Sequence, residues 1–409
     1  MSQAFSKFLS RGVVILLLFL LDLYVFQAVR TATQDLAPLT QQLLFYTYWA
    51  IFVLMAGTFI LVLAMRGTPP TAFQTYYVSL LFGYFAAQLV ALVFLVLDDL
   101  VRLGKELFSS TADVPRSELL SQLGLLLGVV IFLAFIWGMA KGAYTYRVKH
   151  ITLRFPNLPQ AFNGFKMLQI SDLHTGSFQS LAPLQEAVQL INKQQADVVF
   201  FTGDLVNNMA VEVQKHIQTL KEIKARIAVF SVLGNHDYGD YVRWPNPEVK
   251  RQNLRTLIES HGKMGWDILL NENRVVEKDG EHIAVLGVEN WGNRAGFPKY
   301  GQLDKAYAGV EDVPFKVLLS HDPSHWDGEI TKQYPDIDLT LSGHTHGMQF
   351  GLNVFGWKWS PVQYVYKQWA GLYKRGRQLL YVNTGLGFLG YPGRVGFLPE
   401  ITVFELQRA

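Results

Sequence analysis

Four strongly apolar runs dominate the first 150 residues and restrict the fold more than any other feature of the chain. They cover residues 12–29, 43–65, 76–97 and 119–140. A helix needs about 20 residues, within a range of about 17–25, to cross the hydrocarbon core of a bilayer, and each run fits. Lys7 and Arg11 precede the first run, as in a signal sequence, but no small-residue cleavage site follows and three more spans do. We therefore expect residues 1–145 to form a transmembrane region of four helices.

The basic residues near the span ends indicate an orientation. An even number of spans puts both termini on one side, and in short loops Lys and Arg accumulate on the cytoplasmic side. The side of the termini carries Lys7, Arg11, Arg66, Lys141, Arg147, Lys149 and Arg154, and the opposite loops carry Arg30, Arg102, Lys105 and Arg116. The bias predicts a multi-pass protein of the inner (cytoplasmic) membrane, with both termini and the domain after the spans in the cytoplasm.

Asp22 is the one carboxylate well inside a predicted span. Intramembrane acids serve in proton relays and ion paths, or they face the helix bundle and accept hydrogen bonds. No basic residue inside a span is available to pair with Asp22. We therefore favour a bundle-facing residue that accepts hydrogen bonds from Thr or Tyr hydroxyls.

The composition excludes several classes of protein. Half of the residues are hydrophobic and 17% are charged, which is too apolar for a plain cytosolic enzyme. The net charge is +3 and the basic residues form no long stripe, so a nucleic-acid surface is not indicated. Cysteine is absent, which rules out disulfides, thiolate zinc sites and cysteine nucleophiles.

Residues 146–409 have a different pattern, in which short β-rich runs alternate with amphipathic helical segments. The runs are residues 167–170, 198–201, 227–232, 317–319 and 339–341. This alternation predicts a layered α/β domain with buried strands. In open α/β sheets, ligands bind at the carboxyl ends of the strands.

Each of these five predicted strands is followed by Asp, Asn or His side chains. In chain order they are Asp172 and His174, then Asp204, then Asn235, His236 and Asp237, then His321, then His344 and His346. Desolvating such groups without partners is costly, so their repeated occurrence at strand ends indicates a bound ligand. Carboxylate, imidazole and amide donors together suit Mn, Fe or Zn. A bridging carboxylate would hold two ions about 3.5–4 Å apart, the spacing used for in-line displacement at phosphorus.

These blocks resemble the signature of the calcineurin-like metallophosphoesterase superfamily: D-x-H, G-D, G-N-H-D/E, an isolated H, and G-H-x-H. All five occur in the family order between Asp172 and His346. The resemblance covers roughly the last 260 residues and implies a four-layer α/β/β/α sandwich after the transmembrane region. It says little about the four spans, which are more than an anchor needs.

The resemblance also implies a role for each position. One metal ion would be held by Asp172, His174 and His346, the other by Asn235, His321 and His344, with Asp204 bridging them. A hydroxide shared by the ions would attack phosphorus. His236 would stabilise the phosphoryl oxygens or protonate the leaving group, with Asp237 fixing its orientation.

The segment after the last histidine pair is rich in aromatic and basic residues. It contains Phe350, Phe355, Trp357, Trp359, Tyr364, Tyr366, Trp369 and Tyr373, beside Lys358, Lys367, Lys374 and Arg375. Two interpretations stay open: a β-rich closing segment that completes the core, or a lip at the membrane interface, where such residues gather.

The blocks at residues 380–387 and 399–401 resemble the membrane-attached bacterial branch of the superfamily. That branch has relatives among the pyrophosphatases that split UDP-2,3-diacylglucosamine. We interpret the nearby Arg394 as a surface ion-pair partner in preference to an anion contact. His150, His216, His261 and His282 are read as surface or structural residues, and His325 as a candidate second layer behind the ligands.

The sequence therefore predicts a membrane-anchored hydrolase of phosphate esters or anhydrides that uses two divalent metal ions, with Mn²⁺ preferred over Fe or Zn. The spans and the aromatic segment motivate a lipid-linked substrate. The alternatives are a non-catalytic metal-binding scaffold or sensor, and a transporter regulated by the metal domain. The sequence indicates no oligomeric state.

Overall fold

The computed structural model describes residues 3–64, 72–108, 114–294 and 299–409. The chain divides into two compact units, Met1–Met139 and Ala140–Ala409. Met65, at the end of the second predicted span, and Arg66 lie outside the described residues, as do the side chains of Lys7 and Arg11.

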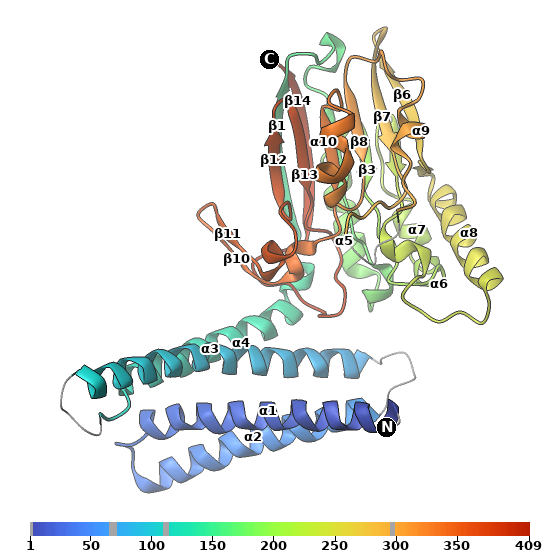
Figure 1. The fold of residues 1–409 in the computed structure, drawn as a ribbon. Coiled ribbons are helices and arrows are strands. Elements are labelled where there is room, and N and C mark those ends of the chain that lie inside the picture. The colour runs from blue at the N-terminus through green and yellow to red at the C-terminus, as the bar shows by residue number, and fades with distance from the viewer. Residues whose placement is uncertain (1–2, 65–71, 109–113, 295–298) are drawn as a thin grey trace. The chain divides into compact units, whose positions relative to one another are not determined.

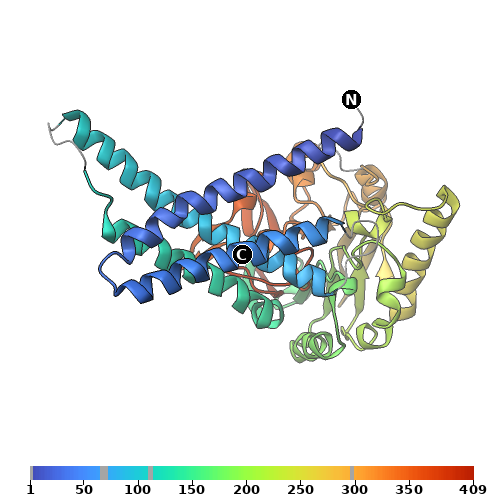
Figure 2. The ribbon, with the colours of Figure 1, turned by 90° about the horizontal axis from the view of Figure 1, so that it is seen from below.

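The first unit consists of four long helices (Figures 1 and 2). They are α1 (Gln3–Ala32), α2 (Pro38–Ala64), α3 (Ala72–Phe108) and α4 (Glu118–Ala140). By length and composition each can cross a membrane. Helices α1, α2 and α3 contact one another, while many apolar side chains point outward, as lipid-facing helices require. The prediction of four membrane helices is confirmed.

Asp22 of α1 lies in a polar cluster between helices α1, α2 and α3. Its carboxylate accepts hydrogen bonds from the hydroxyls of Tyr48 and Tyr84 and, at 2.7 Å, from Nε2 of Gln88. The Asp22 side chain is fully buried. The interpretation of Asp22 as a bundle-facing acceptor of tyrosine hydrogen bonds is confirmed.

Helix α3 is longer than the predicted span, which ended at residue 97. Asp98 and Asp99 lower the local hydropathy, but they do not end the helix. Arg116 lies 3.7 Å from Asp98 and 2.8 Å from Asp99. The carboxylate of Asp98 also accepts the backbone N–H of Ser117 just before α4. These contacts stabilise charged residues at the end of the apolar stretch, so the helix continues to Phe108.

The second unit contains two mixed six-stranded sheets. The first has the order β1 (Arg147–Phe155), β14 (Glu400–Arg408), β2 (Lys166–Ile170), β3 (Val198–Phe201), β4 (Ala228–Ser231) and β5 (Asp267–Ile268). The second has the order β12 (Gly371–Arg375), β13 (Gln378–Val382), β9 (Leu339–Ser342), β8 (Lys316–Leu319), β7 (Glu281–Gly287) and β6 (Glu272–Lys278). A separate hairpin pairs β10 (Leu352–Val354) with β11 (Trp357–Trp359).

The two sheets pack face to face through apolar side chains from both. Phe200 and Phe230 of the first sheet join Val317 and Leu341 of the second in one buried cluster. Helices α5 (Ala182–Lys193), α6 (Val211–Gln214), α7 (Ile217–Leu220) and α8 (Pro247–Met264) accompany the first sheet, and α9 (Leu303–Tyr307) and α10 (Thr331–Gln333) the second. Separate apolar clusters lie on these outer faces. The predicted four-layer α/β/β/α sandwich is confirmed (Figure 1).

The strand directions explain where the polar blocks meet. Strands β2, β3 and β4 pair in parallel, and so do β8 and β9. Their carboxyl ends therefore lie along one edge of each sheet. All five predicted strands correspond to these elements, with boundaries that differ by one residue at most.

Candidate metal centre

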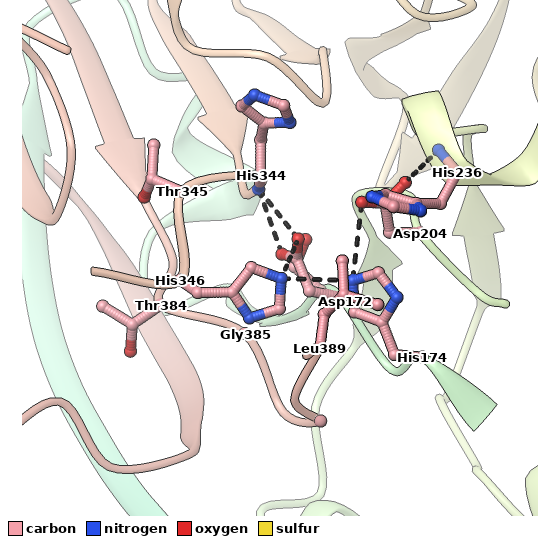
Figure 3. A network of polar contacts seen from close by, with 12 residues as sticks. Asp172, His174, Asp204, His236, His344, Thr345, His346, Thr384, Gly385 and Leu389 are labelled. Atoms are coloured by element: carbon pink, nitrogen blue, oxygen red, sulfur yellow. Dashed lines mark hydrogen bonds and ion pairs between the residues drawn. The ribbon is translucent and has the colours of Figure 1, made fainter. Parts of the chain in front are cut away.

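The first group of converging side chains contains Asp172, His174 and His346. Asp172 and His174 follow β2, and His346 follows β9. Nε2 of His174 and Nε2 of His346 are 3.1 Å apart, and Nε2 of His346 is 3.3 Å from Oδ1 of Asp172 (Figure 3). All three side chains are buried, and their ligand atoms are close enough to share one metal ion.

The second group contains Asp204, His321 and His344, together with the amide of Asn235. Nε2 of His321 lies 3.1 Å from Oδ2 of Asp204 and 3.2 Å from Oδ1 of Asn235. Nδ1 of His344 lies 2.7 Å from the same Asn235 oxygen. The structure therefore brings together all seven residues that the sequence analysis proposed as metal ligands.

The donor atoms of both groups fit divalent cations. Nδ1 of His321 is 2.7 Å from the carbonyl oxygen of Thr202, which can only accept, so the ring proton resides on Nδ1. Nε2, which faces Asp204, is thereby left as the nitrogen that can bind a cation. In the first group, Nε2 of His174, Nε2 of His346 and Oδ1 of Asp172 face one another. Such sets of imidazole, carboxylate and amide donors suit borderline divalent metals, consistent with a binuclear metal site.

Five of the seven ligand residues have a left-handed backbone. The φ angles are 52° at Asp172, 47° at His174, 60° at Asp204, 74° at His344 and 53° at His346. This region costs a residue with a Cβ about 1–2 kcal/mol, and such strain gathers at functional sites. The strained turns direct these side chains from the strand ends into the two groups.

The charges in the centre shift one another's pKa values. Burial alone would raise the pKa of Asp204, but the imidazoles of His321 and His236 hold it well below its usual range. Burial alone would lower the pKa of His321, but the Asp204 carboxylate raises it to about 10. Burial lowers the pKa of His174 to about 3. The negative field that retains a proton on His321 also attracts a cation, whose binding would release that proton.

His236 lies beside both groups. Its backbone N–H donates to Oδ1 of Asp204 at 2.9 Å, and Nδ1 of its ring is 2.7 Å from the carbonyl oxygen of Asn207. Nδ1 therefore carries the ring proton, and Nε2 is left to exchange protons. The ring contacts those of His174 and Tyr241, with centroids 5.0 and 4.5 Å away.

The carboxylate of Asp237 contacts backbone groups and not the ring of His236. Its buried carboxylate accepts backbone N–H groups at 2.8–3.2 Å from Asp204, Leu205, Val206 and Gly234. Burial, followed by the charge of Asp204, raises the pKa of Asp237 to about 7. The carboxylate thus ties two ligand loops together, and the contact that orients the His236 ring comes from Asn207 instead.

Two further residues touch the ligand imidazoles from behind. Nε2 of His344 lies 2.7 Å from the hydroxyl of Tyr366, which fixes the ring with Nδ1 toward Asn235. On the other side, Nη2 of Arg394 donates to Nδ1 of His346 at 3.1 Å. No sequence motif distinguishes Tyr366 from the other aromatic residues of its segment.

Arg394 is fully buried, so the interpretation as a surface ion-pair partner is wrong. Its other N–H groups donate to the backbone carbonyl oxygens of Thr384, Gly387 and Phe397. Burial lowers the pKa of Arg394 to about 10. Backbone carbonyl groups of the segment 384–397 surround the guanidinium. No sequence pattern predicts these contacts.

The remaining histidines take no part in the two groups. The ring nitrogens of His325 lie 2.9 Å from Oγ of Ser320 and 2.9 Å from Oε2 of Glu329. His325 thus supports the strand end that carries His321. His216 and His261 are buried elsewhere, whereas His150 and His282 are exposed.

The aromatic segment after His346 divides into two parts. Tyr366 and Trp369 are buried in a cluster with Val362 and Phe397, as the core interpretation predicted. Phe355, Trp357 and Tyr364 are exposed. Neither interpretation holds for the whole segment.

A sandwich of this kind, with two buried His/Asp groups at its strand ends, is typical of metallophosphoesterases. Two family models match the chain: "Calcineurin-like phosphoesterase" over residues 165–348 and "Probable Calcineurin-like phosphoesterase, transmembrane domain" over residues 6–143. The uncharacterized metallophosphoesterase YkuE of Bacillus subtilis is 32% identical over 263 residues, which cover 63% of this chain and 84% of that protein. The chain belongs to the calcineurin-like metallophosphoesterase family and is a hydrolase with a transmembrane domain.

Two other relatives extend the likeness. A "Transmembrane protein with metallophosphoesterase domain" from Danio rerio is 29% identical over 379 residues, covering 88% of this chain and 81% of that protein. "Phosphodiesterase YaeI" from Escherichia coli is 28% identical over 247 residues, covering 59% and 82% respectively. The zebrafish match is too long to be confined to the catalytic domain, so at least part of the transmembrane region shares in the likeness.

Proposed function

We propose that the protein hydrolyses a phosphoester at the membrane surface with two divalent cations, held by the two groups of side chains. The position of Asp204 carries this proposal. Its Oδ2 lies 3.1 Å from Nε2 of His321 and 3.6 Å from Nε2 of His174. A carboxylate oxygen between the two groups is suited to bridge two cations about 3.5–4 Å apart, the spacing used for displacement at phosphorus.

Each group would hold one cation. Asp172, His174 and His346 would bind the first; Asn235, His321 and His344 would bind the second, with Asp204 between them. When bound, the cations supply Lewis acidity and lower the pKa of a water molecule, which makes it a nucleophile near neutral pH. We propose Mn²⁺ as the native ion, with Fe and Zn compatible with the same donors.

His236 would exchange a proton with the substrate through Nε2. The bond from Nδ1 to the carbonyl of Asn207 fixes the ring, and the bond from its backbone N–H to Asp204 fixes the turn below it. Nε2 can then donate to a phosphoryl oxygen or protonate the leaving group. Asp237 supports this arrangement by holding the backbone of the Asp204 loop.

We propose a phosphodiester or pyrophosphate carried by a lipid as the substrate. The membrane helices confine the domain to the neighbourhood of the bilayer, and a relative bears the name phosphodiesterase. A membrane-bound enzyme gains nothing from its location if its substrate is dilute in water.

The first test uses the full-length protein in detergent with Mn²⁺ and generic aryl phosphodiesters and monoesters. The parent should cleave at least one of them, and Asp204→Ala should remove the activity and one bound ion. Asp279→Ala, at an exposed turn, serves as the matched control and should keep both. A parent that binds two ions but cleaves neither these esters nor a lipid pyrophosphate would instead be a metal-binding scaffold.

The lipid part is tested separately in bilayers. The reconstituted protein is offered the same phosphodiester headgroup on a long-chain lipid and on a water-soluble analogue. We expect a higher kcat/KM for the lipid. An equal or higher value for the soluble analogue would exclude a lipid substrate and leave the hydrolase intact.

We further propose that both termini face the cytoplasm, on the basis of the Lys and Arg bias between the loops. The chain has no cysteine, so Ala409→Cys provides a unique thiol. A membrane-impermeant maleimide should label it in inside-out vesicles and not in right-side-out ones. The opposite pattern would reverse the orientation.

A further inference from the structure

The hairpin of β10 and β11 has one apolar face and one polar face. Its register pairs Leu352 with Trp359 and Val354 with Trp357 on one face, and Asn353 with Lys358 on the other. The exposed fractions are 47% for Leu352, 49% for Val354 and 58% for Trp357. Figure 1 shows the hairpin projecting from the body of its domain. A two-stranded hairpin with an uncovered apolar face is at best marginally stable in water.

The tip of this hairpin carries a residue that its backbone disfavours. Phe355 and Gly356 form a two-residue turn with φ angles of 49° and 84°. The turn between β6 and β7 has almost the same geometry, with Asp279 at 50° and Gly280 at 78°. Asp or Asn followed by Gly is the favoured pair for such a turn. The chain uses Asp at one tip and places a fully exposed Phe at the other.

The base of the hairpin is joined to the metal centre. Between ligand His346 and β10, the residues Gly347, Met348 and Gln349 continue the left-handed backbone, with φ angles of 55–56°. Oγ of Ser360, which follows β11, donates to the carbonyl of Gly347 at 2.9 Å. A contact that restrains the hairpin therefore also restrains the loop that carries His346.

We propose that the apolar face and the Phe355 tip of this hairpin insert into the interfacial region of the bilayer that contains the chain's own helices. Only residues 141–146 separate α4 from β1, so a short linker tethers the second unit to the membrane. Exposed Trp and Phe side chains match the composition of membrane–water interfaces.

A bilayer fits this surface better than a protein partner. Each strand of the hairpin has three residues, which is too short an edge for a partner to extend the sheet. Lys358 on the polar face points back toward the domain, with Nζ 3.4 Å from the carbonyl of Ala370. The apolar residues are thus left together on the side that the domain does not cover. The inference concerns membrane contact alone and holds whether or not the proposed catalytic function does.

The absence of cysteine allows a direct test in the full chain. Val354→Cys is labelled with a polarity-sensitive fluorophore and reconstituted into phosphatidylcholine–phosphatidylglycerol vesicles that contain nitroxide-labelled lipid. Asp279→Cys, at the equivalent turn of the other hairpin, is the matched control. We expect blue-shifted emission and several-fold stronger lipid quenching at position 354 than at position 279. Equal quenching at both positions would overturn the proposal.

Shielding from both the lipid quencher and aqueous iodide would also overturn it, because a protein, either a second copy or another partner, would then cover the hairpin.

A second variant tests the contribution of the tip. Phe355→Asp added to Val354→Cys introduces a residue that the turn favours and replaces the apolar side chain with a charged one. Quenching at position 354 should fall several-fold and return with Phe355→Trp, while the circular dichroism spectrum stays the same. Unchanged quenching in Phe355→Asp would contradict insertion of the tip.

Discussion

Arg394 donates a hydrogen bond through Nη2 to Nδ1 of His346, while three backbone carbonyl oxygens accept its other N–H groups. Because an arginine cannot accept a hydrogen bond, Nδ1 must receive this one, and a neutral His346 ring then carries its proton on Nε2. A cation bound by Nε2 would displace that proton and leave an imidazolate that the guanidinium stabilises. The edge of the His346 ring that carries Nε2 is thereby turned toward Asp172 and His174. Arg394 is thus a positioning residue for a candidate metal ligand.

Replacement of Arg394 should weaken metal binding at the first group. Groups that orient a ligand typically contribute about 10–100-fold to metal affinity. We expect a loss of this size in Arg394→Met and a smaller one in Arg394→Lys, which keeps a donor but not the fork. Isothermal titration with Mn²⁺ measures it, with the exposed Arg377→Met as control. Equal affinities in the parent and in a folded Arg394→Met would refute the role.

Tyr366 should act in the same way on the second group. Its hydroxyl fixes the Nε2 edge of His344, so Tyr366→Phe frees the ring to rotate. We expect one of the two Mn²⁺ ions to bind about 10-fold more weakly. Tyr364→Phe removes a hydroxyl from an exposed neighbour and should leave both affinities unchanged. A similar response in the two variants would show that the hydroxyl of Tyr366 has no special role.

Asp237 should be more important for stability than its charge alone suggests. Asp237→Ala leaves four buried backbone N–H groups without their acceptor, and each orphaned donor costs about 1–3 kcal/mol. We expect a loss of at least about 4 kcal/mol in the free energy of unfolding, measured by denaturation in detergent. Asp240→Ala breaks a surface ion pair with Lys250 and a surface hydrogen bond with Tyr300, and it should cost at most about 1 kcal/mol. Comparable losses in both variants would contradict this account.

Acid should destabilise the catalytic domain partly through His261. Burial lowers the pKa of His261 from 6.5 to about 3. Below pH 6.5 the unfolded chain therefore takes up a proton that the folded chain refuses. Stability falls as the pH decreases from 6.5 toward 3, by at most about 1.4 kcal/mol per pH unit. The loss of Tm between neutral and mildly acidic buffer should be smaller in His261→Gln and unchanged in the exposed His282→Gln. Identical losses in all three proteins would exclude His261 as the cause.

The sequence was sufficient to predict that the candidate metal ligands come together, because their positions follow from topology. Asp172, Asp204 and Asn235 each follow a strand of one parallel set, and His321 and His344 follow two parallel strands of the other sheet. Parallel strands end at a common edge, so residues far apart in the chain had to meet. The spans were equally predictable, because bilayer thickness fixes their length.

The residues behind the ligands could not be predicted in this way. Tyr366 and Arg394 reach the site through the closing segment, whose path depends on packing rather than on strand order. The role of Asp237 was assigned from its neighbour in sequence, yet its carboxylate bonds to a loop about thirty residues away in the chain. Contacts between irregular segments leave no periodic pattern to read.

The left-handed backbone at five candidate ligands lowers the stability of the fold, whereas the side chains at these positions are suited to bind metal ions. Glycine adopts these angles without strain, so replacing Asp172 or His346 by Gly would relieve about 1 kcal/mol while removing a metal donor. Selection for thermostability alone would therefore drift toward chains that keep the sandwich and lose the ions. The presence of Asp or His at all five positions, despite the strain, is expected if metal binding is under selection.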